Sequence, residues 1–504
     1  MAVKLAVSFL TGLMMVAMAW AGMGLAPVNA PTGRADLPLD VAGGSSADVE
    51  PAPLDSTLQA GAHAIDITPA PNGAKGERWQ TQNCATGFVN ENTAAQRKTA
   101  TPDCIYMGGR GLGPSEPITS IDSENPLMVR AVALGDGEDT VVLVQVDGVY
   151  WFGRYASFCD ACGAYDIIED LSKELNIDPS GFLIAANHSH NAPDFIGGWG
   201  SVPRWYMEQV GESIREAIRS AVASMRPATV EFGEAVARDL NVERRKFYYS
   251  AEDPTFTWLR AYDGEKVVAT VGAFSAHPVT TGYQGGKAHA DWPGAFDQMM
   301  RDATGAPGVA FVAGLGNMLT RQGTWQTAEG LAKLVEGRGG GRPVTNPDVA
   351  SAITFWDQPL TNAGLVGLRH GQFFDRPVDG APGAITAGKS TAKPCRSASE
   401  QTVRTSASAV RIGDELVITG GPGELFSNLT NSVKERSGAR TVALPLANVN
   451  DGLGYIMQSF ETDHLGRQVL GFTPAPVEYE DAFGLDACFG DMVLQTIVAM
   501  LREL

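Results

Sequence analysis

The stretch DTVVLVQVDG (residues 139–148) is an almost unbroken run of apolar, β-branched residues, and it predicts a buried strand that ends at Asp147. Residues 164–178 (AYDIIEDLSKELNID) follow with the spacing of a helix, and residues 180–187 (SGFLIAAN) form a second buried run. A long amphipathic helix is then expected over residues 204–225. Strands and helices in alternation indicate an α/β fold with buried strands.

The same alternation continues toward the C-terminus. Further strands are expected at residues 266–276, 308–314, 414–421 and 440–446, and further helices at residues 424–438 and 491–504. Between them, residues 321–393 are rich in Gly, Pro and polar residues with weak periodicity, which is typical of an insertion or a lid. We therefore expect mixed β-sheets with flanking helices, forming a single large domain over residues 59–504.

Composition limits the classes of partner. A chain of 504 residues with 44% hydrophobic and 19% charged residues is typical of a globular protein with a sizeable core. Its formal net charge of -19 would repel a phosphate backbone, so we expect no nucleic acid partner. After the N-terminus no segment approaches the length of a membrane span, so we expect no stable membrane insertion of the mature domain. The sequence carries no signal of the oligomeric state.

The N-terminal segment has the pattern of an export signal. Residues 1–30 combine one lysine, a long apolar stretch and small residues before Ala30, which predicts a secretory signal cleaved near that residue. The alternative is an uncleaved membrane anchor, because the apolar stretch is long enough to span a bilayer. Residues 31–58 are rich in Pro, Gly, Ala, Ser and acids and predict a flexible linker. In either case we expect an extracytoplasmic protein. It would be secreted or periplasmic, or anchored to the membrane if the N-terminus is not cleaved.

The chain contains six cysteines, an even number that is compatible with up to three disulfides in an exported protein. Cys159 and Cys162 form a single C-x-x-C without the second pair that a zinc site would need, so we expect a local disulfide between them. The pairing of the other cysteines stays open.

Two histidines follow the strand predicted at residues 180–187, in the stretch NHSHNAPD (residues 187–194). Residues i and i+2 of a strand point to the same side, so His188 and His190 could offer two imidazoles to one metal ion. The alternative is a pair of loop histidines held only by hydrogen bonds.

Other strand ends carry residues of the same chemical kind. His277 follows one buried strand, Glu424 follows another at a Gly-Pro-Gly turn, and Tyr455 lies beyond a third. Catalytic groups of α/β proteins gather at strand ends, and such a set could enclose zinc while leaving one position for water. As alternatives, Glu424 caps a helix and Tyr455 is a buried core phenol. Three nearby aspartates are candidates for orienting histidines or capping loops: Asp147, Asp194 and Asp291.

Four motifs, taken in this order, resemble the catalytic domain of the neutral/alkaline, non-lysosomal ceramidases over roughly residues 59–504. They are NHSHNAPD, AHPVTTGYQGGKAHADWPG, GGPGELF and NVNDGLGYIMQSFE. The resemblance implies that zinc (Zn2+) is bound by His188, His277, Glu424 and Tyr455. It also implies that His190 helps to position or deprotonate the attacking water, and that Arg244, in NVERRKF, approaches the substrate.

Two positions depart from the family pattern. Leu319 stands where the family has a serine, and Gly452 stands where it has the first tyrosine of a pair. These departures leave the metal ligands in place and indicate an acylated substrate that differs from ceramide or is broader.

The resemblance therefore predicts an exported, zinc-dependent hydrolase that cleaves an amide (N-acyl) bond of a small molecule or lipid with a metal-activated water, in a ceramidase-like catalytic domain. One alternative is a true ceramidase that releases fatty acid from N-acylsphingosine. An alternative of another class is a non-catalytic protein that binds a lipid or glycan on the same fold.

Overall fold

The computed structural model describes residues 58–69, 79–86, 101–110, 113–114, 116–245, 250–338, 340–362, 365, 383–390, 393–399, 401–438, 441–462 and 479–504, with the backbone alone for 383–390, 393–398, 479 and 482. The chain divides into two units, Met1–Ser56 and Thr57–Leu504, and every described residue belongs to the second. The expected signal at residues 1–30 and linker at residues 31–58 lie outside the described residues, except for Leu58, which is buried.

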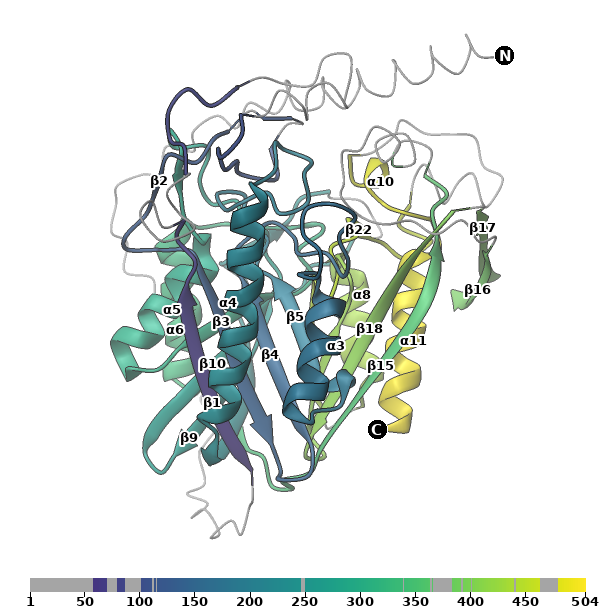
Figure 1. Cartoon of the computed structure of the whole chain (residues 1–504). Coiled ribbons are helices and arrows are strands. Elements are labelled where there is room, and N and C mark those ends of the chain that lie inside the picture. The colour runs from purple at the N-terminus through teal and green to yellow at the C-terminus, as the bar shows by residue number, and fades with distance from the viewer. Residues whose placement is uncertain are drawn as a thin grey trace. The chain divides into compact units, whose positions relative to one another are not determined.

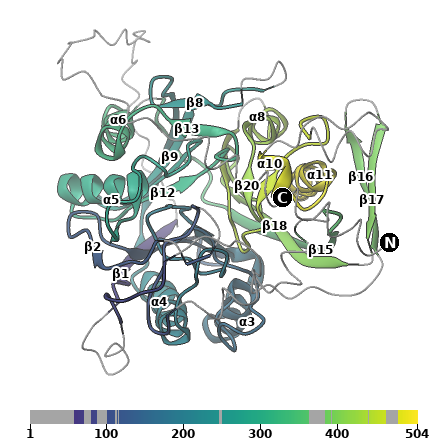
Figure 2. The same cartoon turned by 90° about the horizontal axis from the view of Figure 1, so that it is seen from above.

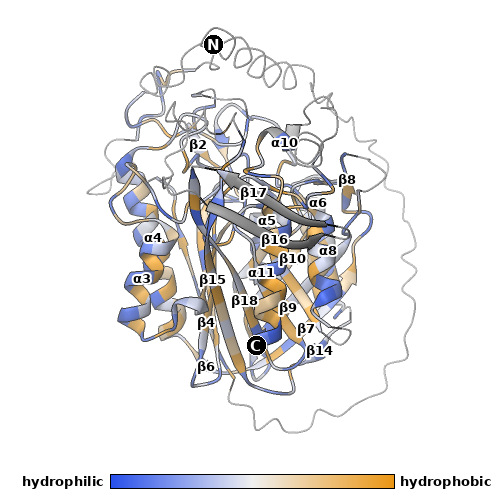
Figure 3. Ribbon diagram, turned by 90° about the vertical axis from the view of Figure 1, so that its right-hand side faces the viewer, coloured by the Kyte–Doolittle hydropathy of each residue, from blue (hydrophilic) through white to orange (hydrophobic). Residues whose placement is uncertain are grey.

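The first of three mixed sheets has the strand order β5-β4-β3-β1-β6. Its strands are β1 (Gln59–Asp66), β3 (Met128–Gly135), β4 (Thr140–Val146), β5 (Phe182–Ala186) and β6 (Arg226–Pro227). β4 and β5 are parallel and are joined through α3 (Ala164–Leu175), whereas β1, β3 and β4 pair antiparallel. Hydrophobic residues of α3 and of α4 (Arg204–Ala223) pack on this sheet, and Figure 3 shows them alternating with hydrophilic ones along both helices.

The second sheet has the strand order β12-β10-β9-β7-β14. Its strands are β7 (Thr229–Val236), β9 (Thr255–Asp263), β10 (Lys266–Phe274), β12 (Gly308–Val312) and β14 (Arg342–Pro343). Its parallel pair is β10 with β12, which are joined through α5 (Asp291–Thr304). The helix α6 (Thr324–Glu336) packs on α5.

The third sheet has the strand order β15-β18-β19-β21. Its strands are β15 (Val349–Pro359), β18 (Thr402–Ile412), β19 (Leu416–Gly420) and β21 (Val442–Leu446). Here β19 and β21 are parallel, with α8 (Ser427–Arg436) between them in the chain, and α11 (Phe489–Glu503) packs on β15 and β18. Each sheet therefore has one parallel pair of strands with a helical connection.

The remaining elements lie outside these three sheets and are mostly short. They are β2 (Ser120–Ile121), η1 (Pro179–Gly181), β8 (Asn241–Glu243), β11 (Lys287–Ala288), β13 (Met318–Thr320), β16 (Gly383–Ser390), β17 (Lys393–Ser399), β20 (Glu424–Leu425), β22 (Tyr455–Ile456) and α10 (Tyr479–Ala482). Two of them, β20 and β22, form a parallel two-stranded ladder that carries two of the predicted metal ligands.

One hydrophobic core joins the three sheets. It contains Leu134 of the first sheet, Val271 of the second and Ile418 of the third, all fully buried. The helices lie outside this core: Figures 1 and 2 show α3 with α4, α5 with α6, and α8 with α11 in three groups around the sheets. The expectation of mixed sheets with flanking helices in a single large domain is confirmed. Within residues 321–393, expected to be an insertion or a lid, α6 and β15 are instead integral elements of the fold.

Two disulfides join described cysteines, Cys84 with Cys104 and Cys159 with Cys162, so the expected local disulfide is present. Cys488 is disulfide-bonded as well. Within the described part of the chain, no helix is both long and apolar enough to span a membrane.

Candidate metal centre

The first donor of the site is held by the turn that follows β5. His188 lies in the left-handed backbone region, with φ 64, which is uncommon for a residue other than glycine. The side chain of the preceding Asn187 stabilises this turn, because its Oδ1 accepts from the backbone N–H groups of Gly148 and Ser189. The buried Nδ1 of His188 donates its proton to the carbonyl oxygen of Val149 at 2.8 Å, which leaves a lone pair on Nε2.

The second donor has the same arrangement on the second sheet. His277 follows β10, and its Nδ1 donates to the carbonyl oxygen of Leu315 at 2.6 Å, so its Nε2 also presents a lone pair. Burial lowers the pKa of His277 to about 3 and that of His188 to about 4. Both imidazoles are therefore neutral near pH 7, which is the form that binds a metal ion.

The third donor is the carboxylate of Glu424 on β20. Its Oε2 lies 3.1 Å from Nε2 of His277 and 3.6 Å from Nε2 of His188. Among the described residues this buried oxygen has no hydrogen-bond partner. Burial also raises the pKa of Glu424, and a positive charge beside the carboxylate would oppose this shift.

The separations between these atoms fit a metal ion. Zinc binds imidazole nitrogen and carboxylate oxygen at about 2.0–2.2 Å, and a tetrahedron of such bonds has edges of roughly 3.3–3.5 Å. The distances of 3.1 and 3.6 Å lie on either side of that range. Two neutral imidazole lone pairs and a carboxylate oxygen would repel one another without a cation between them. The donor set therefore fits a divalent metal.

The ring of His190 completes a group of three histidines. Its Nε2 lies 3.2 Å from Nε2 of His188, and the ligand nitrogens of His188, His190 and His277 all lie within 4.8 Å of one another. Gly109 lies against this ring, since a Cβ there would approach the ring's Cγ to 2.4 Å. Burial lowers the pKa of His190 well below its ordinary value, so this ring is neutral at pH 7.

Tyr455 and Arg244 form the other wall of the site. Tyr455 on β22 is directly paired with Glu424 on β20, and the two strands are parallel. Arg244, which follows β8, donates from Nη2 to the hydroxyl oxygen of Tyr455 at 3.1 Å and to the carbonyl oxygen of Gly316 at 2.8 Å. The same nitrogen lies 2.8 Å from Oε1 of Glu480. Arg244 thus brings a positive charge to the phenol oxygen of Tyr455.

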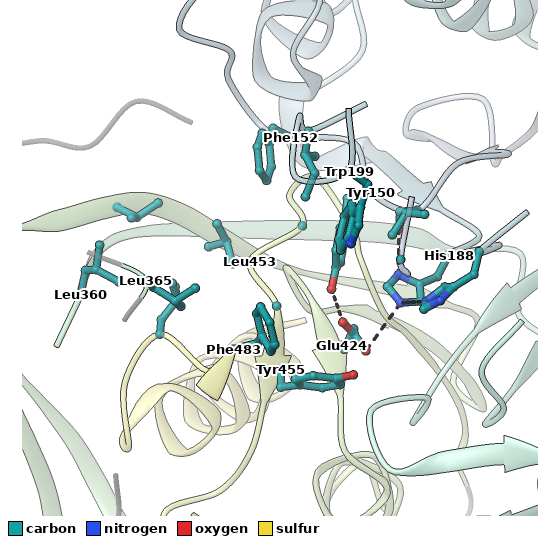
Figure 4. A pocket seen from close by; sticks show the side chains of 18 residues that line it. Tyr150, Phe152, His188, Trp199, Leu360, Leu365, Glu424, Leu453, Tyr455 and Phe483 are labelled. Carbon is teal, nitrogen blue, oxygen red and sulfur yellow. Dashed lines mark hydrogen bonds and ion pairs between the residues drawn. The ribbon is translucent and has the colours of Figure 1, made fainter. Parts of the chain in front are cut away.

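A pocket lined at one end by His188, His190, Glu424 and Tyr455 encloses about 850 Å³ of space, part of it open to solvent. Figure 4 shows Tyr455 below Glu424, and it shows Tyr150 and His188 joined to Glu424 by dashed lines. The rest of the wall is apolar and consists mainly of Val149, Phe152, Ile196, Trp199, Leu360, Leu365, Val403, Leu453, Phe483 and Leu485. The site therefore has one polar end and a hydrophobic remainder.

The structure brings together all six residues singled out in the sequence: His188, His190, Arg244, His277, Glu424 and Tyr455. The three aspartates stabilise the surrounding loops. Asp147 accepts from the side chain of Asn187 at 2.7 Å, and Asp194 accepts from four backbone N–H groups of the loop that carries Ile196 and Trp199. Asp291 accepts from Thr280.

Two residues of the site were not predicted from the sequence. Tyr150 donates its hydroxyl proton to Oε1 of Glu424, and its position just after β4 places it at the same sheet edge as His188, which is a signal that could have found it. Glu480, which pairs with Arg244, has no such signal because it follows no predicted strand.

Comparison with known proteins gives the fold. No protein-family model and no curated protein matches the chain. The solved structures that match include two with a TM-score of 0.59 over 89% of this chain: a ceramidase complexed with C2, 13% identical and covered over 76% of its length, and the neutral ceramidase from Pseudomonas aeruginosa, 14% identical and covered over 75%. The chain therefore has a neutral ceramidase-like fold, as the motifs predicted.

Proposed function

We propose that this protein is a zinc-dependent hydrolase of amide (N-acyl) bonds. The observation that carries the proposal is the convergence of Nε2 of His188, Nε2 of His277 and Oε2 of Glu424 at separations of 3.1 and 3.6 Å. We assign these three residues and Tyr455 as the ligands. Zinc is favoured over magnesium or calcium because two of the four donors are imidazoles, whereas the harder cations prefer oxygen ligands. A zinc ion at this position would activate a water molecule and polarise the carbonyl group of a substrate.

Two residues would act beside the ligands. His190, whose Nε2 lies 3.2 Å from that of His188, is a neutral base placed to accept a proton from the attacking water and return it to the leaving amine. Arg244 donates to the hydroxyl oxygen of Tyr455 at 3.1 Å and so favours the phenolate that a tyrosine ligand requires. Its positive charge would also stabilise the oxyanion that forms from the substrate carbonyl.

The substrate class follows from the pocket. Apart from the polar end, the wall is made of aliphatic and aromatic side chains, which favour a substrate with an apolar acyl or amine portion. The two structures of similar fold are ceramidases, which supports an N-acyl substrate. We also infer that the enzyme works outside the cytoplasm, because its disulfides persist in an oxidising compartment and its N-terminus resembles an export signal.

The first test measures bound metal and hydrolysis on the same preparation. Purified protein is expected to contain about one zinc per chain and to cleave N-acyl amides. The substrates are N-acylsphingosines, short N-acyl amides and esters with the same acyl groups. In His188→Ala, bound zinc should fall to background and kcat/KM should fall by roughly 10²–10⁴-fold, because the metal supplies several kcal/mol of transition-state stabilisation.

The matched control is His63→Ala, which removes an exposed histidine of β1 and should leave both quantities unchanged. Wild-type protein that contains no metal after purification and binds none on titration would contradict the proposal and favour a binding protein. If only N-acylsphingosines are cleaved, the enzyme is a true ceramidase. Cleavage of the esters alone would contradict the assignment to amide bonds.

A further inference from the structure

Tyr150 contacts the proposed metal ligands but has no part in the function proposed above. It is 5% exposed, and its ring lies edge-on to the ring of His188, with the ring centroids 4.7 Å apart and an interplanar angle of 69°. Its hydroxyl donates a hydrogen bond to Oε1 of Glu424, as the dashed line in Figure 4 shows. Tyr150 therefore contacts two proposed ligands at once.

This contact distinguishes the two oxygens of Glu424. Oε1 accepts the proton of Tyr150, whereas Oε2 faces the imidazoles of His188 and His277 and has no hydrogen-bond partner among the described residues. A carboxylate with one oxygen engaged by a phenol is held in one orientation and presents a single oxygen to a metal ion. Groups that hold ligands in this way commonly change metal affinity by about 10–100-fold.

The space for the ring of Tyr150 depends on Gly452. A Cβ at Gly452 would lie 2.6 Å from both Cβ and Cδ1 of Tyr150, which is closer than real contacts allow. The backbone of Gly452 is not in the left-handed region, so a larger residue would meet no penalty from a positive φ there. The glycine is therefore required for space alone.

Asp451 connects the loop that carries Tyr150 to the loop that carries Gly452. Oδ1 of Asp451 accepts from the backbone N–H of Gly153 at 3.0 Å and from that of Gly452 at 3.1 Å. This side chain thus ties the loop that carries Tyr150 to the loop that precedes Tyr455. The contact between these two loops therefore helps to hold the side chain of Tyr150 in place.

We propose that Tyr150 is a positioning residue: its hydroxyl holds Glu424 so that Oε2 alone binds the metal, in a space that Gly452 leaves free. This inference rests on the proposed function, because it assumes that Glu424 is a ligand.

The test uses two variants of the whole protein. Tyr150→Phe removes the hydroxyl and keeps the ring, and Gly452→Ala displaces the ring and keeps the hydroxyl. Both are expected to lower zinc affinity by about 10-fold or more, measured by competition with a chelator. Both should also change the visible absorption spectrum of the cobalt-substituted protein, which reports the ligand geometry. The double variant should lose little more than either single variant, because both changes break the same contact.

The control is Tyr206→Phe, which removes the hydroxyl of another fully buried tyrosine, one that donates to the carbonyl oxygen of Ile67 at 2.9 Å in the core of the first sheet. It should bind zinc as the wild type does, with an unchanged cobalt spectrum, even if its melting temperature falls. Wild-type zinc affinity together with a wild-type cobalt spectrum in Tyr150→Phe would overturn the inference.

Different experimental results would refute the proposed function and the proposed role of Tyr150. Wild-type protein that binds no zinc refutes the metal site and this inference with it. Wild-type protein that binds zinc without cleaving any amide refutes the proposed reaction alone, since the affinity and the spectrum of Tyr150→Phe still decide the role of Tyr150.

Discussion

Glu461 shows how one buried side chain makes stability depend on pH. Its Oε1 accepts from the side chain of Asn428 at 2.8 Å, and its Oε2 accepts from the backbone N–H of Gln458 at 3.1 Å. Both bonds favour the carboxylate, but burial outweighs them and raises its pKa from 4.5 to about 7. The folded protein therefore holds a proton at Glu461 that the unfolded chain releases near pH 4.5.

We predict that the free energy of unfolding falls because of Glu461 as the pH rises from about 4.5 to 7. The full contribution is present below pH 4.5, where both states are protonated, and it is lost as the pH passes the folded pKa. The loss is at most about 1.4 kcal/mol per pH unit and on the order of 3 kcal/mol in total. The Glu461→Gln variant should lack this pH-dependent loss of stability. Urea unfolding at pH 5, 6, 7 and 8 should therefore show the wild type losing stability relative to the variant as the pH rises.

The exposed Glu265, in the turn between β9 and β10, provides the control, because Glu265→Gln should follow the wild-type curve. Parallel pH curves for wild type and Glu461→Gln would contradict the prediction.

The histidine pair shows what residue-level reasoning can and cannot supply. The spacing of His188 and His190 after an apolar run was enough to mark a candidate metal site. The proton on Nδ1 of His188 depends on the carbonyl oxygen of Val149, which belongs to a neighbouring strand end, so the sequence could not indicate which nitrogen is free.

At the scale of elements, the ladder of β20 and β22 decides where Glu424 and Tyr455 lie. The sequence predicted a helix over residues 424–438, but Glu424 lies on β20 and the helix α8 begins at Ser427. Pairing with residue 455 holds Glu424 in extended conformation, and such a distant partner leaves no local pattern in the sequence.

We predict that Gly423→Ala weakens this ladder. A Cβ at Gly423 would lie 2.5 Å from the backbone oxygen of Gly454, so the added methyl group must push β22 away from β20. Overpacking of this kind costs about 1–3 kcal/mol of stability. Because Glu424 and Tyr455 would separate, zinc affinity should fall by about 10-fold or more as well. Thermal unfolding and chelator competition measure the two effects.

Gly282→Ala is the control for this variant, since an added Cβ there meets no atom within 4 Å and both quantities should stay unchanged. Normal zinc affinity in Gly423→Ala would show that the ladder does not determine the ligand geometry.

Buried strands and amphipathic helices were predicted well, because unbroken apolar runs and helical spacing come from packing on a large core. All but the first residue of β4 are buried, for example, and the run is visible directly in the sequence. By contrast, β15 is the edge strand of its sheet and mixes buried with exposed residues, so it was not recognised. Its conformation depends on pairing with β18, whose residues are distant in the chain.

For the whole molecule, the central feature is that each sheet contributes one donor. His188 follows β5 of the first sheet, His277 follows β10 of the second, and Glu424 follows β19 of the third. The sequence indicated that each residue ends a strand. It could not indicate that three separate sheets share a core and direct these ends toward one point, because that arrangement arises only from packing between distant segments.

A buried cluster of charges also links two of these layers. Arg130 on β3 donates to Asp147 at 2.9 Å and to Asp297, on α5 beside the second sheet, at 2.7 Å. We predict that Arg130→Met lowers the free energy of unfolding by about 3–5 kcal/mol, because Asp147 would remain buried without its cation and Asp297 would keep only its pairing with Arg301. Chemical denaturation followed by tryptophan fluorescence measures the change.

A matched surface pair is available for comparison. Arg226 pairs with Asp263 at 2.9 Å, with both side chains partly exposed, so Arg226→Met should cost no more than about 1 kcal/mol. Equal losses in Arg130→Met and Arg226→Met would show that the buried cluster does not join the layers.

The spread of the proposed ligands along the chain also bears on when the proposed metal site can form. The residues that would bind zinc range from His188 to Tyr455, so a nascent polypeptide still short of Tyr455 lacks a full coordination set. Metal acquisition would then be a late event, after the third sheet has closed against the other two.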